Sequence, residues 1–285
     1  MRRFEKLIYI LTVLAMIGLF VFGIKKYFAN TQNVNGQTNA DIGLEHQERV
    51  FYEPEYNAKY IRNINTIEIS NEEIKNKNQF VYISDLHVSC VNEEEEDEQI
   101  RESLLKRNLD FYGDKDSSIA KNTFKEIVNY TNNKNANALL LTGDIIDSPA
   151  DSSVAVLREN LNNLKTDYLY TLGNHDWSFP WDYHTENAKQ VERPKFEEFM
   201  DDTGVSYLEY EDLMILAINS STDQIEEESL DKIKQVLEKQ KPTIVIMHVP
   251  ISTPEIAHDS LRYRNRVSAT GDGGITPTEA TRKSV

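Results

Sequence analysis

The chain has 285 residues, enough for one large domain and an extension, because about 200 to 250 residues commonly form a single α/β unit. Its 31 basic and 47 acidic residues give a formal charge of −16, which repels phosphate backbones and argues against general nucleic-acid binding. The single cysteine, Cys90, excludes an internal disulfide and a thiolate cluster for structural zinc. Histidine, aspartate and asparagine are therefore the side chains left to hold a metal.

The amino terminus carries a predicted membrane anchor. Residues Leu7–Ile24 form a run of 18 positions without a formal charge, and basic residues flank it on both sides. A cleaved signal peptide is the alternative, but Lys25, Lys26 and Tyr27 follow the run in place of a small-x-small cleavage motif. The short basic amino terminus favours retention on the inner side. We therefore expect residues 1–28 to cross the cell membrane once, with the following domain extracytoplasmic.

Residues 29–75 are rich in asparagine, glutamine and glutamate, which predicts a linker that contains a short leading strand near Thr66–Ile69.

Residues 76–285 carry the main domain. In this domain short apolar runs alternate with helical patterns, which predicts an α/β fold with largely buried sheets. The predicted strands are Phe80–Ser84, Ala138–Thr142, Tyr168–Leu172, Leu213–Ile218 and Thr243–Met247. The predicted helices are Ser118–Tyr130, Ser153–Leu164, Lys195–Met200 and Glu227–Lys239.

Polar residues recur where the predicted strands end, and ligands of α/β sheets gather at the carboxyl ends of strands. Asp85 and His87 follow the first strand. If that strand continues through them, its period of two places both side chains on one face, where they can bind a cation together. The acidic run Glu93–Glu98 comes next and predicts a solvated loop, with a gating role near these two residues as the alternative.

Two further strands are followed by a glycine and then by polar side chains. Gly143 precedes Asp144, whose carboxylate can accept two metal ions, one on each oxygen; a helix cap or turn is the alternative. Gly173 precedes Asn174, a neutral oxygen ligand, and His175, which can point at substrate. A turn would explain the glycine and the asparagine but not the histidine.

His248 ends the last apolar strand, and a lone histidine in such a place is more often a satisfied core residue than a ligand. In combination, however, the order Asp-x-His, Gly-Asp, Gly-Asn-His-Asp and His is similar to the calcineurin-like metallophosphoesterase family over roughly Phe80–Pro250. This resemblance implies an α/β fold, built as a four-layer αββα sandwich of two mixed sheets. It also implies an enzyme that hydrolyses phosphate monoesters or diesters at a binuclear metal centre.

The resemblance assigns metal ligands residue by residue. Asp85 and His87 would bind the first metal, and Asp144 would bridge both metals. Asn174 and His248 would bind the second metal. These imidazole, carboxylate and carbonyl ligands suit two divalent ions of Mn, Fe, Zn or Co, without selecting one of them.

His175 is the implied catalytic residue, which would assist the leaving group as a proton donor. The implied substrate is a phosphate ester. Its class stays open among nucleotides, phospholipids, wall-polymer precursors and phosphoproteins, because one fold hosts many substrates.

The family's usual closing element, Gly-His-x-His, is missing from this sequence, although its histidines complete both metal shells in the family. The segment Thr276-Pro277-Thr278-Glu279 predicts the start of a helix, and only six residues follow that glutamate. We therefore expect a C-terminally truncated member of the family. The alternatives are a variant with a substitute ligand and a catalytically inactive member that acts as a binding module.

Overall fold

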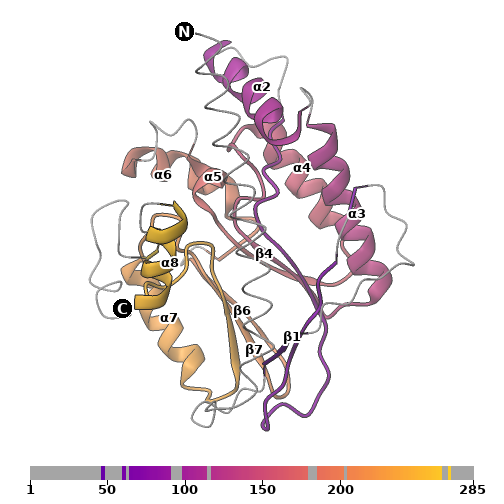
Figure 1. Cartoon of the computed structure of the whole chain (residues 1–285), viewed down its shortest axis with the longest axis vertical. Helices are drawn as coiled ribbons and strands as arrows, with labels where there is room; N and C mark the ends of the chain where they lie inside the picture. Colours follow the sequence, from indigo (N-terminus) through magenta and orange to yellow (C-terminus); the bar gives the residue numbers. More distant parts are fainter. Residues whose placement is uncertain are drawn as a thin grey trace, which may run out of the picture. The chain divides into compact units, whose positions relative to one another are not determined.

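The main domain is described by a computed structural model (Figure 1). The chain divides into two units, Met1–His46 and Gln47–Val285, and almost all described residues belong to the second unit. The predicted anchor Leu7–Ile24 lies outside the described residues. No helix in the part of the chain that the structure describes is both long and apolar enough to cross a bilayer. The described residues are 46–48, 60–61, 64–90, 98–113, 117–178, 185–201, 204–264 and 269–270.

The first sheet has the strand order β3-β4-β5, and both of its strand pairs are parallel. Parallel neighbours need long crossover connections, and these connections run through helices. The strands are β3 (Phe80–Ile83), β4 (Ala138–Thr142) and β5 (Asp167–Thr171). The crossover helices are α2 (Glu98–Tyr112), α3 (Ser118–Lys134) and α4 (Asp151–Asn162).

The second sheet has the order β6-β7-β8 and is mixed. Strands β6 (Val205–Glu209) and β7 (Met214–Ile218) pair antiparallel because a short turn joins them. Strand β8 (Thr243–Ile246) pairs parallel with β7 after the crossover helix α7 (Glu227–Leu237). Of the two predicted mixed sheets, the second is mixed, whereas the described strands of the first sheet are all parallel because each connection between them is helical.

The remaining elements are short or lie beside these sheets. They are β1 (His46–Glu48) and β2 (Ile67–Ile69), which pair with each other, α5 (Asn174–Trp177), α6 (Glu186–Glu192), the 3-10 helix η2 (Arg193–Phe196) and α8 (Pro254–Arg264).

Three apolar clusters hold the layers together. Along β4 the side chains alternate, so that Leu139 and Leu141 pack with Phe124 of α3, whereas Leu140 faces the second sheet. The cluster between the sheets joins Leu140 to Ile215 of β7. The other face of the second sheet packs against α7. The layers therefore follow in the order helices, sheet, sheet, helix, and the α/β class is confirmed.

Most differences from the predicted elements lie outside the buried strands. All five strands predicted for the main domain form, each within one residue of its predicted ends, and β2 is the leading strand predicted near Thr66–Ile69. Helix α2 was not predicted, and Glu98 of the acidic run is its first residue. A helix predicted over Lys195–Met200 is wrong, because this stretch holds only the end of η2 and turns. Strand β6 was also not predicted, and the helix predicted from Thr276 lies outside the described residues.

Candidate metal centre

The loop after β3 places Asp85 and His87, but not as the continuing strand that the sequence suggested. The strand ends at Ile83, and both residues have left-handed backbone conformations, with φ of 55° and 48°. Two backbone bonds fix this turn to the loop after β4: the Asp85 N–H donates to the carbonyl of Gly143 at 3.1 Å, and the His87 N–H donates to that of Asp144 at 2.9 Å. The two side chains are therefore positioned by the neighbouring loop.

Two glycines allow the loops after β4 and β5 to approach closely. Gly143 has φ of 84°, and a Cβ atom there would lie 2.6 Å from the backbone nitrogen of Gly173. A Cβ atom on Gly173 would lie 2.1 Å from Oδ1 of Asp144. Both positions exclude any side chain, which is the physical reason for the two glycines that precede the polar residues.

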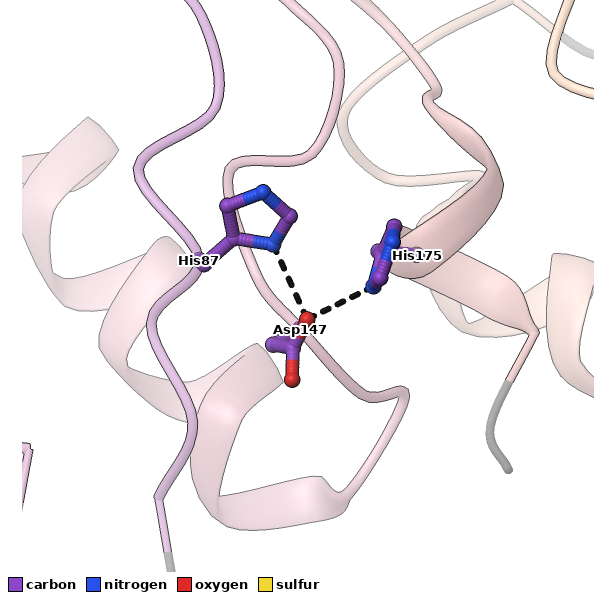
Figure 2. A group of neighbouring side chains, drawn as sticks. All are labelled: His87, Asp147 and His175. Carbon is purple, nitrogen blue, oxygen red and sulfur yellow. Dashed lines mark hydrogen bonds and ion pairs between the residues drawn. The ribbon is translucent and has the colours of Figure 1, made fainter. Parts of the chain in front are cut away.

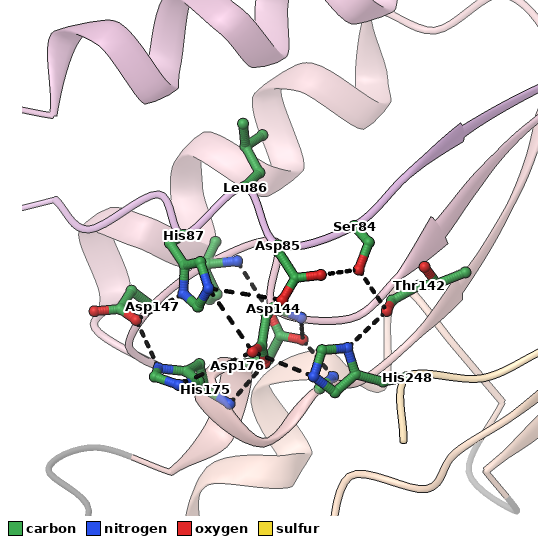
Figure 3. A network of polar contacts seen from close by, with 12 residues as sticks. Ser84, Asp85, Leu86, His87, Thr142, Asp144, Asp147, His175, Asp176 and His248 are labelled. Carbon is green, nitrogen blue, oxygen red and sulfur yellow. Dashed lines mark hydrogen bonds and ion pairs between the residues drawn. The ribbon is translucent and has the colours of Figure 1, made fainter. Parts of the chain in front are cut away.

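Three imidazoles converge on one oxygen of Asp144, and Figure 3 shows them around its carboxylate. The Nε2 atom of His248 lies 3.2 Å from Oδ2 of Asp144. The Nε2 atoms of His87 and His175 each lie 3.9 Å from the same oxygen. Asp85 joins this group with Oδ1 3.9 Å from His87 Nε2, although 59% of its side chain is exposed. The structure thus brings together residues that follow four different strands, β3, β4, β5 and β8.

The opposite ring nitrogens of His87 and His248 each face an acceptor. His87 Nδ1 donates to Oδ1 of Asp147 at 2.9 Å, and His248 Nδ1 donates to the carbonyl of Thr142 at 2.9 Å. A proton on Nδ1 leaves the lone pair of the neutral ring on Nε2, the atom that faces Asp144. Lone pairs and a carboxylate that meet at one point attract a cation, so the donor set fits a divalent metal ion.

The effect of this arrangement on proton affinity agrees with a cation site. Burial alone would lower the pKa of His248, but its hydrogen bond and charge interaction with Asp144 raise that pKa to about 9. The pKa of Asp144 is lowered although burial alone would raise it, because three histidines surround the carboxylate. The cluster therefore attracts positive charge, which a proton or a metal ion can supply.

Asp147 orients two of the histidines, as Figure 2 shows. Its Oδ1 lies 2.9 Å from His87 Nδ1 and 2.7 Å from His175 Nδ1. Arg107 of α2 donates to both oxygens of Asp147, through Nη2 at 2.7 Å and through Nε. Burial alone would raise the pKa of Asp147, but these three partners hold it well below its usual range.

His87, Asp147 and His175 lie close enough together to bind a metal ion by themselves. The guanidinium of Arg107 already neutralises Asp147, so a second cation at this place would be repelled. Nη2 of Arg107 also lies 2.9 Å from His175 Nδ1. We place a proton on that nitrogen because its contact with the ionised Asp147 is the shorter one. Asp147 therefore orients the imidazole rings of His87 and His175 through their Nδ1 atoms.

Asp176 connects the loop after β4 to the loop after β5, a role that the sequence did not suggest. Its buried carboxylate accepts hydrogen bonds from the backbone N–H groups of Gly173 at 2.7 Å, Asp144 at 2.9 Å and Ile146 at 2.9 Å. Burial and the nearby charge of Asp144 raise the pKa of Asp176 to about 7. Its place directly after His175 in the motif was the signal that could have identified it.

The other predicted site residue, Asn174, opens the short helix α5 beside His175 and is partly buried. Asp85, His87 and Asp144 form a group with ligand atoms within 4.8 Å of one another. The sequence missed Arg107, since no spacing links it to the motif residues. Thus all six predicted residues lie in the three loops after the first sheet's strands or directly after β8.

The comparison with family models now decides the family. The model described as calcineurin-like phosphoesterase matches residues 79–272, the part of the chain that contains every residue of this cluster. This chain belongs to the calcineurin-like phosphoesterase family. A solved dimetal phosphatase from Danio rerio is similar at 13% sequence identity and a TM-score of 0.39, over 61% of this chain and 70% of the other. A search of curated proteins found no match.

The raised pKa of His248 predicts how the stability of this calcineurin-like phosphoesterase depends on pH without metal. A pKa raised from about 6.5 to about 9 stabilises the fold fully below pH 6.5, and this contribution disappears as pH rises through 9. In excess chelator, the thermal midpoint should therefore fall between about pH 6.5 and pH 9. His248→Gln should flatten this fall, whereas His258→Gln, at an exposed position, should not. Equal slopes in both variants would contradict the assignment.

Proposed function

We propose that this chain hydrolyses phosphate esters with the help of two divalent metal ions bound around Asp144. The observation that carries the proposal is the convergence of three Nε2 atoms on one carboxylate oxygen, at 3.2 Å for His248 and 3.9 Å for His87 and His175. Membership of the calcineurin-like phosphoesterase family supports the reaction type.

The ligands divide between two ions that share Asp144. Asp85, His87 and Asp144 would hold the first ion, and Asp144, Asn174 and His248 would hold the second. This mixed donor set suits Mn, Fe, Zn or Co. When bound, such a pair of ions polarises the phosphoryl group and lowers the pKa of a coordinated water.

His175 would act as the proton donor to the leaving group. Its Nδ1 lies 2.7 Å from Asp147, which fixes the orientation of the ring, and its Nε2 lies on the side of Asp144. In the protonated ring, Nε2 carries the proton that a departing alkoxide needs. Asp147 would keep the ring in this orientation during the transfer.

Metal removal tests the proposed reaction. The full chain in mild detergent should hydrolyse an aryl phosphate, lose this activity in excess chelator, and regain it when Mn²⁺ or Zn²⁺ is added back. The amount of coloured phenol released measures the extent of hydrolysis. A well-folded chain that hydrolyses neither aryl monoesters nor aryl diesters with any of the four metals would contradict the proposal and favour a binding module.

A substitution of His175 tests its role as proton donor. His175→Gln should slow hydrolysis by about 100-fold or more for esters with a poor leaving group such as phenol. The loss should be small for a dinitrophenyl ester, because that leaving group departs without a proton. Turnover rates for a series of leaving groups check this, and a uniform loss across the series would assign His175 to another role.

The uncharged run Leu7–Ile24 supports a further part of the proposal, a single membrane pass with the phosphoesterase domain on the outer face. Such an anchor would bring lipid and envelope phosphate esters within reach. The full chain should then remain in the membrane fraction after alkaline extraction, and a chain that begins after Asn30 should not. Release of both forms would contradict the anchor.

A further inference from the structure

Helix α2 contributes a cation to the candidate metal centre from outside the family motif. Arg107 lies on this helix and donates to Asp147 through Nε and Nη2. Nη2 also lies 2.9 Å from His175 Nδ1. The guanidinium is thus in contact with His175, the proposed proton donor, and with Asp147, which orients that ring.

The guanidinium is held in one orientation. The two hydrogen bonds to Asp147 fix Nε and Nη2 of the guanidinium. The Cζ atom of Arg107 also lies 4.9 Å from the ring centroid of Phe111, one turn further along α2. Phe111 itself stacks on His87, with ring centroids 4.3 Å apart and an angle of 12° between the planes. A cation fixed in this way loses little conformational entropy when it binds a ligand.

One nitrogen of Arg107 is left for a ligand. Nη1 carries two N–H donors and makes no hydrogen bond to any residue in the described ranges. The side chain is 21% exposed, so the group is not sealed inside the protein. A guanidinium in this state binds the oxygens of a phosphoryl group well, because its planar donors match their geometry.

We propose that Arg107 binds a nonbridging oxygen of the substrate's phosphoryl group and thereby favours phosphate monoesters over diesters. The inference rests on the proposed function and names its substrate class. A monoester carries one more negative charge than a diester at neutral pH, and it offers one more nonbridging oxygen. The positive charge of Arg107 is paired with Asp147, but its Nη1 group supplies N–H donors beside His175 that match the additional nonbridging oxygen of a monoester.

Binding of inorganic phosphate tests the inference without turnover. Calorimetry on the metal-loaded full chain should show phosphate affinity about 10-fold to 100-fold weaker in Arg107→Met than in the unaltered chain. Arg107→Lys should lie between them, because it keeps the charge but loses the planar fork. Arg101→Met, on the same helix at a site where the arginine pairs with Glu98, is the matched control and should bind phosphate normally.

Turnover separates binding by Arg107 from orientation of His175 through Asp147. Arg107→Met should lower kcat/KM for an aryl monoester about 100-fold and for an aryl diester less than about 5-fold. Equal losses for both substrates with unchanged phosphate affinity would overturn the inference and leave Arg107 a positioning residue. If Arg107→Met does not fold, the same comparisons with Arg107→Lys decide. An unaltered chain that binds phosphate but has no turnover would contradict the proposed function, while phosphate affinities still test Arg107.

Discussion

The candidate metal centre depends on the hydrogen bonds behind its histidines. Asp147 accepts from Nδ1 of His87, and the Thr142 carbonyl accepts from Nδ1 of His248, so that both rings present Nε2 to Asp144. Without these acceptors either ring nitrogen could carry the proton, and the lone pairs would not converge. Thr142 is the last residue of β4, and Asp147 lies in the loop that follows it. The buried central strand therefore determines which ring nitrogens of His87 and His248 face Asp144.

The close packing of the loops makes this arrangement possible. Gly143 and Gly173 let two strand ends approach to a distance that any Cβ atom would prevent. The buried carboxylate of Asp176 then accepts hydrogen bonds from three backbone N–H groups of these loops. It thereby joins the loops where the strand pairing of the sheet has ended. These residues therefore shape both the fold and the candidate site, because the site is formed from the loops that follow the strands of the first sheet together with His248 after β8.

The sequence predicted five strands of the main domain, but not β6, because buried strands are short apolar runs, and it predicted six site residues from the polar motif that follows those strands. It did not predict the left-handed turn at Asp85 and His87, which is imposed by backbone bonds to the loop after β4. It also missed α2, whose charged sequence resembles a solvated segment, and therefore missed Arg107. The contact of Arg107 with Asp147 arises from packing across 40 residues and leaves no local pattern.

Metal content shows directly whether Asp144 is the centre of a two-metal site. The full chain and its Asp144→Asn variant are equilibrated with Mn²⁺ or Zn²⁺, freed of unbound ions and examined by elemental analysis. A carboxylate shared by two ions predicts that the unaltered chain holds two ions and that the variant, checked to be folded in chelator, holds neither tightly. Equal metal content in both proteins, or none in the unaltered chain, would contradict a metal centre built on Asp144.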